Sequence, residues 1–170
     1  HPIAAVAAQR EEHVLSQLRN DAAAAQSVEH GNTKIREIHV ERLLETAHSG
    51  SQRFYTLSPY VGCLIGCRFC YAQTRLATVR RLAGLNDVPW GSWVDVRINA
   101  AEVLAHELST RSPQPIKFCP IVSDPYQAVE KRYGITRQCL EVLRDAPEWP
   151  VFVLTRSHQI QHDAELIASI

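Results

Sequence analysis

The spacing of apolar and polar positions along this chain predicts a mixed α/β protein. An alanine-rich stretch over residues 4–26 carries Val14 and Leu18 four residues apart, which favours an amphipathic helix that ends by Gly31. We therefore expect residues 1–52 to form an N-terminal helical extension, with a turn at 48–51 before the first strand.

From residue 53 onward, strand patterns and helix patterns follow each other in turn. The predicted core strands cover 53–57, 116–122 and 151–154, and the last is an uninterrupted apolar run suited to burial on both faces. Residues 94–98 alternate apolar and polar positions, which predicts a short edge strand. Helical spacing predicts four helices, over 73–82, after Asn99 as N-cap, over 136–145 and from Gln161 onward.

This order of elements implies a mainly parallel sheet with helical crossovers, and we expect residues 53–170 to form one core of about three β/α units. A chain of 170 residues with 45% hydrophobic and 21% charged residues has the ordinary composition of a globular protein. The formal net charge is zero, so the overall charge does not support a nucleic-acid or membrane partner.

The cysteines and the ends of the chain bear on where the protein works. Three of the five cysteines are clustered, whereas the cysteines of a secreted disulfide framework would be spread through a smaller chain. No stretch approaches the ~20 apolar residues of a membrane span, and the N-terminus lacks a signal-peptide pattern. We therefore expect a cytoplasmic protein. Because the chain has no methionine and begins with His1, we also expect it to start after the natural start.

The clearest chemical signal is a Cys-x3-Cys-x2-Cys run formed by Cys63, Cys67 and Cys70. Three thiolates on so short a loop converge when the chain curls around a metal centre, either a zinc ion or an iron–sulfur cluster. Tetrahedral zinc needs a fourth ligand, and the nearest candidates are His48, His106 and Cys119. Three cysteines would instead leave one iron of a 4Fe–4S cluster open for chemistry.

Each predicted core strand leads into a polar loop. The cysteine run follows the first strand, residues 123–127 follow the second, and residues 155–157 follow the third. Because ligands in parallel α/β folds bind at the carboxyl ends of the strands, we expect these three loops to share one rim.

The cysteine run, with the aromatic Phe69 just before its last cysteine, resembles the radical S-adenosylmethionine superfamily. The flanking Ser-Pro-Tyr-Val-Gly-Cys at 58–63 and Cys-Tyr-Ala at 70–72 are similar to the branch related to spore photoproduct lyase. This resemblance implies the first half of a partial (β/α)6 barrel. It also implies a 4Fe–4S cluster on the three cysteines and reductive cleavage of S-adenosylmethionine to a 5′-deoxyadenosyl radical. An electron donor such as flavodoxin or ferredoxin would be the partner, and the substrate is not indicated.

The resemblance also implies which residues contact the cofactor. Related proteins carry Asp-Pro-Tyr-Gln and then Glu and Thr-Arg, matched here by 124–127, Glu130 and 136–137. In spore photoproduct lyase, a Ser-Asp pair and the lysine of Thr-Lys-Ser help to hold S-adenosylmethionine. The matching positions in this chain are Ser123, Asp124 and Arg156, where arginine replaces the lysine. Phe69 would lie beside the adenine.

One departure from that branch concerns a hydrogen-donor cysteine, whose position two residues before the Ser-Asp pair is occupied here by Ile121. Cys119, two residues earlier, is the remaining candidate for a catalytic cysteine, although a buried small side chain is the simpler interpretation. Cys139 is expected in the core. Ile121 and the absence of excess positive charge disfavour DNA photoproduct repair.

Two other functions remain open at this point. The chain could be a non-catalytic module that binds zinc or an iron–sulfur cluster through the same cysteines. It could also be a truncated remnant, too short to act alone, whose exposed sheet edge needs a partner.

Overall fold

The computed structural model of the chain describes residues 32–118 and 121–170, together with the backbone of residues 26–30. The helix predicted over 4–26 therefore lies outside the described residues up to Gln26, which begins a strand. Cys119, the candidate catalytic cysteine, also lies outside them.

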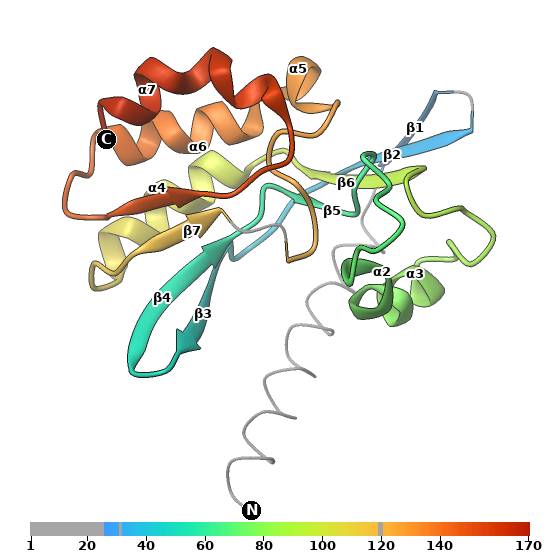
Figure 1. Ribbon diagram of the computed structural model, residues 1–170, viewed down its shortest axis with the longest axis horizontal. Helices are drawn as coiled ribbons and strands as arrows, with labels where there is room; N and C mark the ends of the chain where they lie inside the picture. Colours follow the sequence, from blue (N-terminus) through green and yellow to red (C-terminus); the bar gives the residue numbers. More distant parts are fainter. Residues whose placement is uncertain (1–25, 31, 119–120) are drawn as a thin grey trace, which may run out of the picture.

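Two mixed four-stranded sheets form the frame of the protein (Figure 1). The first sheet has the order β1-β2-β6-β5, with β1 at Gln26–His30, β2 at Thr33–Ile38, β6 at Trp93–Arg97 and β5 at Tyr60–Val61. The second has the order β3-β4-β7-β8, with β3 at Leu44–Ser49, β4 at Gln52–Leu57, β7 at Ile116–Phe118 and β8 at Val151–Val153.

The helices lie on two sides of this frame. The first side holds α2 (Ala72–Arg75) and α3 (Ala77–Leu82). The other side holds α4 (Ala100–Thr110), α6 (Ile135–Arg144) and α7 (Ala164–Ala168), with the short α5 (Glu130–Tyr133) and the 3₁₀ helix η1 (His158–Asp163) between strands and helices (Figure 1). In the part of the chain that the structure describes, no helix has the length and apolar character needed to cross a membrane.

The main core lies between the second sheet and the helices α4, α6 and α7. In α6, Cys139, Leu140 and Leu143 recur at helical spacing and are fully buried, as the sequence predicted for this face. They pack with residues of β7 and α4, among them Ile116, Phe118 and Leu104. Cys139 is therefore a core residue.

The three predicted core strands are neighbours. β4, β7 and β8 run parallel, and the register places Tyr55 beside Ile116 and Ile116 beside Val151. Their carboxyl ends consequently reach the same edge of the second sheet, which confirms the arrangement expected for the three polar loops.

Two strands occupy different places from those predicted. β6 is central, between β2 and β5, and its Val94 and Val96 are fully buried, so the prediction of an edge strand was wrong. β8 is an edge strand of the second sheet, and both Phe152 in it and Leu154 just after it are more than half exposed. The pattern of apolar residues predicts which faces of a strand are apolar. It does not predict whether a neighbouring strand or a second layer covers that strand.

Residues 33–38 and 44–49 form strands, so the helical character predicted for 1–52 is wrong there. β2 pairs with β6 and β3 pairs with β4, which joins this region to strands from the rest of the chain.

The α/β class is confirmed. Of the strand pairings in the described residues, β1–β2, β3–β4 and β5–β6 are antiparallel, and no barrel closes among those strands.

Candidate functional site

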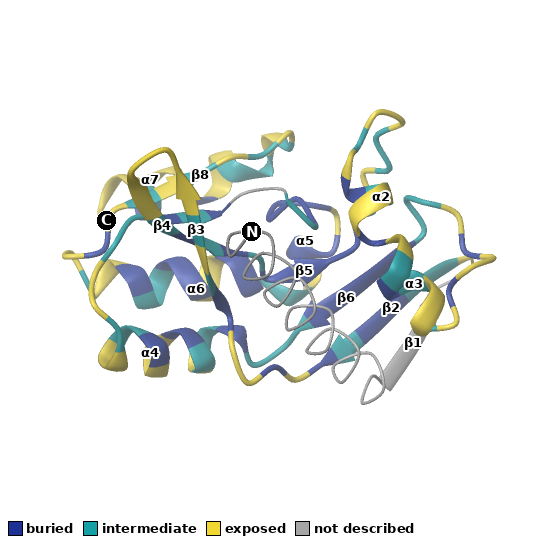
Figure 2. Ribbon diagram, turned by 90° about the horizontal axis from the view of Figure 1, so that it is seen from below, coloured by how far each residue is buried: buried dark blue, intermediate teal, exposed yellow. Residues whose placement is uncertain are grey.

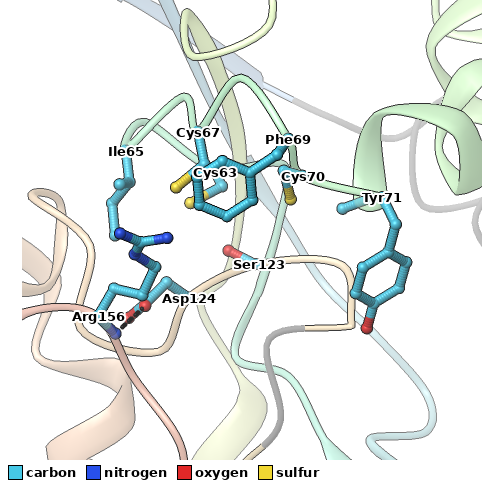
Figure 3. Close-up of a pocket in the computed structure, with 10 residues that line it drawn as sticks. Cys63, Ile65, Cys67, Phe69, Cys70, Tyr71, Ser123, Asp124 and Arg156 are labelled. Carbon is cyan, nitrogen blue, oxygen red and sulfur yellow. Dashed lines mark hydrogen bonds between the residues drawn. The ribbon is translucent and has the colours of Figure 1, made fainter.

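A cavity of about 160 Å³ lies where the three polar loops meet (Figure 3). All seven residues predicted as cluster or cofactor contacts line it, namely Cys63, Cys67, Phe69, Cys70, Ser123, Asp124 and Arg156. Ile65, Tyr71 and Ala72 complete the lining. Residues that are up to 93 positions apart in the sequence therefore surround one cavity, while their roles towards a ligand remain predictions.

The three cysteines lie on the cysteine loop, residues 62–71, between β5 and α2. All three are free thiols. Cys63 is buried, and this burial raises the pKa of its thiol, whereas Cys67 and Cys70 are half-buried. Three free thiols at one cavity are a suitable donor set for zinc or an iron–sulfur cluster. Among the residues whose placement is described, however, no three Cys, His, Asp or Glu side chains are already close enough to hold a metal ion. A metal would have to draw the loop together, as metals commonly do at cysteine sites.

The histidines considered as zinc ligands lie elsewhere. His48 is exposed on β3, His106 is exposed on α4, and neither lines the cavity. Asp124 is the carboxylate that does line it. A tetrahedral zinc site in this arrangement would therefore use the three cysteines with Asp124 rather than with a histidine.

The start of the cysteine loop is fixed by contacts to its backbone. Gly62 has φ +81°, and a Cβ there would lie 2.7 Å from the Trp93 ring and from the Trp93 carbonyl oxygen. The Gly62 N–H donates to the carbonyl of Val122 at 3.1 Å, and the Ser123 hydroxyl donates to the Gly62 carbonyl at 2.6 Å. Only glycine fits this close approach with a left-handed backbone.

Gln127 holds the same loop, and the sequence did not assign it a role. Its side chain is almost fully buried, its Oε1 accepts from the Leu64 N–H at 2.8 Å, and its Nε2 donates to the Ser123 hydroxyl at 2.5 Å and to the Gly62 carbonyl at 3.2 Å. Its place in the Asp-Pro-Tyr-Gln segment was the signal available in the sequence.

Asp124 connects the second polar loop to the third. Its Oδ1 accepts from the Tyr126 N–H at 2.8 Å and from the Thr155 hydroxyl at 2.6 Å, and its Oδ2 accepts from the Arg156 N–H at 2.8 Å (Figure 3). A carboxylate offers about four acceptor positions, so these three bonds leave limited capacity for a ligand. Asp124 thus organises the loops whether or not it also contacts a cofactor.

Arg156 and Phe69 lie at the mouth of the cavity. The Arg156 guanidinium carbon is 4.9 Å from the centre of the Phe69 ring, and Phe69 is 77% exposed. A cation–π contact at an exposed site contributes about 0.5–1 kcal/mol, so both side chains can turn towards a ligand at little cost.

A buried group behind the cavity links β5 to α6. The Tyr60 hydroxyl donates to Glu130, whose carboxylate also accepts from the backbone N–H groups of Thr136 at 3.0 Å and Arg137 at 3.1 Å. Burial raises the pKa of Glu130. This carboxylate satisfies free N–H groups at the start of α6 and positions the strand that leads into the cysteine loop.

Comparison with known proteins gives relatives but no activity. No family model and no solved structure matches the chain. An uncharacterized protein of Methanocaldococcus jannaschii is 29% identical over 115 residues, which are 66% of this chain and 39% of that protein. Uncharacterized proteins of Mycobacterium tuberculosis and Mycobacterium bovis are 32% identical over 115 residues, which are 67% of this chain and 33% of theirs. The chain thus spans between a third and two fifths of the length of these curated relatives.

Proposed function

We propose that this chain is the cluster-binding part of a radical S-adenosylmethionine enzyme, with Cys63, Cys67 and Cys70 as ligands of a 4Fe–4S cluster. The observation that carries the proposal is the lining of one cavity. Three free cysteines, an exposed aromatic ring, a Ser-Asp pair and an arginine meet there from three separate loops. In this proposal, β4, β7 and β8 are parallel strands in the first half of a partial (β/α)6 barrel.

When bound, such a cluster supplies one electron for cleavage of the S-adenosylmethionine sulfonium, which yields a 5′-deoxyadenosyl radical. The side chains around the cavity then have separate tasks. Phe69 offers a flat apolar face to the adenine, and the Arg156 guanidinium pairs with the carboxylate of the methionine moiety. Ser123 and Gln127 keep the cysteine loop in place through the Gly62 carbonyl.

Asp124 has a double task in this proposal. Its three hydrogen bonds hold the second and third loops together. Its remaining acceptor capacity would be available to the ribose hydroxyls of a bound S-adenosylmethionine. Because removal of Asp124 would disturb the loops as well as the ligand, Arg156 gives the cleaner test of cofactor binding. The substrate and the electron donor, a flavodoxin or ferredoxin, belong to the activity of the whole protein.

A second candidate is a non-catalytic zinc module. It is favoured by the position of Asp124, which lines the cavity and would be the fourth ligand of a Cys3Asp site once a metal drew the cysteine loop together. This candidate predicts a colourless protein that contains about one zinc ion and no iron.

Anaerobic reconstitution with iron and sulfide, followed by metal analysis and an assay for 5′-deoxyadenosine under reducing conditions, separates the two candidates. We expect about four iron atoms per chain and release of 5′-deoxyadenosine. Cys67→Ala should abolish both, whereas the core variant Cys139→Ala should retain both. Arg156→Ala should keep its iron and bind S-adenosylmethionine about 10- to 100-fold more weakly, because it loses one charge-assisted contact. Bound zinc without iron, or release of 5′-deoxyadenosine by Cys67→Ala, would refute the proposal.

A further inference from the structure

The positive charge of this chain is unevenly distributed. No aspartate or glutamate occurs between Glu45 and Asp87, although five arginines do. The formal net charge of the whole chain is zero, so the rest of the chain carries the compensating acidic residues. This acid-free stretch contains the cysteine loop, α2 and α3.

Three of these arginines are exposed in the segment that contains the cysteine loop, α2 and α3. Arg68 lies on the cysteine loop between Cys67 and Phe69, Arg75 is at the end of α2, and Arg81 is on α3. Within the described part of the chain, none of the three forms a salt bridge. Arg80 is different, because its guanidinium donates to the backbone carbonyl of Val88 and is half-buried.

Large apolar side chains are exposed in the same segment of the chain. The exposed fraction is 77% for Phe69, 54% for Tyr71, 49% for Leu82 and 39% for Ile65. The Arg75 guanidinium carbon lies 5.9 Å from the centre of the Tyr71 ring. Figure 2 shows that α2 and much of α3 are exposed, on the side of the molecule away from α4 and α6.

Apolar and aromatic side chains with arginines around them are typical of the centre of a protein–protein interface. Phe69 and Tyr71 could also stack on nucleic-acid bases. Ile65 and Leu82 offer no ring for stacking, and this favours a protein partner over a single-stranded nucleic acid. The unpaired positive charge requires that the facing surface of the partner be acidic.

We propose that the arginine surface, formed by Ile65, Arg68, Phe69, Tyr71, Arg75, Arg81 and Leu82, docks an acidic redox protein that delivers the electron for the neighbouring cavity. The electron-transfer part rests on the proposed function. The reduced partner would lose one electron, which a cluster held by Cys63, Cys67 and Cys70 would accept, and no bond would form or break. Phe69 and Tyr71 line both the cavity and this surface, so a docked partner would lie directly against the cysteine loop.

The partner is also expected to dock on the side of the molecule where the core helices do not cover the cysteine loop. The core helices α4, α6 and α7 cover the opposite side of the frame, whereas the cysteine loop projects beside α2 (Figure 1). Steering by exposed charges weakens with ionic strength, because the Debye length falls from ~10 Å at 0.1 M salt to ~3 Å at 1 M.

The test measures direct binding of an acidic flavodoxin to the full chain at low and high salt, with Arg75→Glu, Arg81→Glu and the double variant. Each single charge reversal should weaken flavodoxin binding about tenfold at low salt, and the double variant should weaken it further. High salt should weaken binding to the unaltered chain. Arg144→Glu on α6 is the matched control, because it makes the same change in charge at an exposed position on another face. Its affinity should stay within about twofold of that of the unaltered chain.

Two further measurements identify the partner class and separate the proposals. Release of 5′-deoxyadenosine driven by dithionite, which needs no protein donor, should be the same in all these variants, whereas release driven by flavodoxin should fall with the binding affinity. If the affinity for flavodoxin were unchanged in both charge-reversal variants, or were the same at low and high salt, the proposed docking surface would be refuted. The proposal would also be refuted if flavodoxin did not bind while a 20-nucleotide oligo(dT) bound tightly to the unaltered chain and not to the charge-reversal variants. Charge-dependent flavodoxin binding without dithionite-driven release would support the surface and refute the proposed enzyme.

Discussion

The second sheet and the cysteine loop rest on hydrophobic clusters of different size. Between the second sheet and α4 and α6, a large cluster contains fully buried side chains from several elements, including Leu104, Ile116, Phe118, Leu140 and Leu143. Beneath the cysteine loop, a smaller cluster comprises Val61, Ala72, Leu76, Val79, Leu85, Val88 and Trp93. The candidate chemistry is therefore on the side with less apolar packing.

Different interactions hold the two regions. Complementary apolar side chains dominate the large cluster, whereas specific bonds to the loop backbone determine where the cysteines lie. The Gly62 carbonyl accepts from Ser123 and Gln127, and the Leu64 N–H donates to Gln127. Few apolar contacts and a defined set of hydrogen bonds allow a loop to rearrange around a ligand without unfolding the scaffold.

Matched leucine truncations should show the difference in packing most strongly. We expect Leu140→Ala to lower the free energy of unfolding by about 2–5 kcal/mol, because Leu140 is fully buried in the large cluster. Leu76→Ala removes the same atoms from the smaller cluster, which can close over the space more easily, so its cost should be nearer the lower end of that range. Urea denaturation followed by circular dichroism measures both, and an equal or larger cost for Leu76→Ala would contradict the comparison.

Two glycine variants should sharpen the comparison at the loop itself. Both Gly62 and Gly50 have positive φ, so alanine at either position should cost about 1–2 kcal/mol of backbone strain. At Gly62 the added Cβ also meets Trp93 at 2.7 Å, whereas at Gly50 it meets nothing within 4 Å. We expect Gly62→Ala to lose about 1–3 kcal/mol more than Gly50→Ala, since it overpacks the contact with Trp93.

The same pair tests the link to metal binding. Gly62→Ala should reduce iron incorporation, because the loop can no longer sit against Trp93, while Gly50→Ala should retain it. Iron content and denaturation midpoints can be measured on the same preparations. If Gly62→Ala incorporates iron as fully as Gly50→Ala does, then the close approach to Trp93 does not position the cysteines.

The smallest expected effect is a pH dependence of stability at the junction between the two regions. Burial raises the pKa of Glu130 above its ordinary value of 4.5, so the folded protein binds this proton more tightly than the unfolded chain does. The stabilisation from the bound proton is complete below pH 4.5 and is lost as the pH rises through the raised pKa. The slope in that range is at most about 1.4 kcal/mol per pH unit.

Glu130→Gln should remove this part of the pH dependence, because an amide does not titrate. It should also lower stability at every pH, since one of the backbone N–H groups of Thr136 and Arg137 would face an amide donor. Urea denaturation of both proteins between pH 4.5 and 8 is the measurement. A slope that is identical in the two proteins would show that another group is responsible.

Local patterns predicted much of the scaffold and of the candidate site. The strand that ends at Leu57 and the helix over 135–144 were predicted from short-range spacing and are present. Asn99 was predicted as an N-cap and lies at that position, but its side chain bonds both backbone groups of Val40 instead of the helix. The capping pattern correctly predicted where the helix starts, but it did not predict that the Asn99 side chain bonds Val40.

The convergence of the three loops could also be predicted, because parallel neighbouring strands place their carboxyl ends at one edge. Strand order could not be predicted from the apolar patterns. β6 is central because β2 and β5 pair on either side of it, and β2 comes from a region in which only helical structure was expected. The acid-free stretch between Glu45 and Asp87 can be read from the sequence, but the net charge of zero does not reveal it.

By itself, the sequence determined the α/β class, the three cysteines within eight residues and the polar ends of the core strands, because each is a property of neighbouring residues. Only the tertiary structure decided which strands are central, and that Gln127 and Glu130 hold the segment around the cysteine loop. Gln127 meets Leu64 across 63 positions of the sequence, and Glu130 meets Tyr60 across 70. Such contacts depend on how the whole chain packs, and no periodicity within a single segment encodes them.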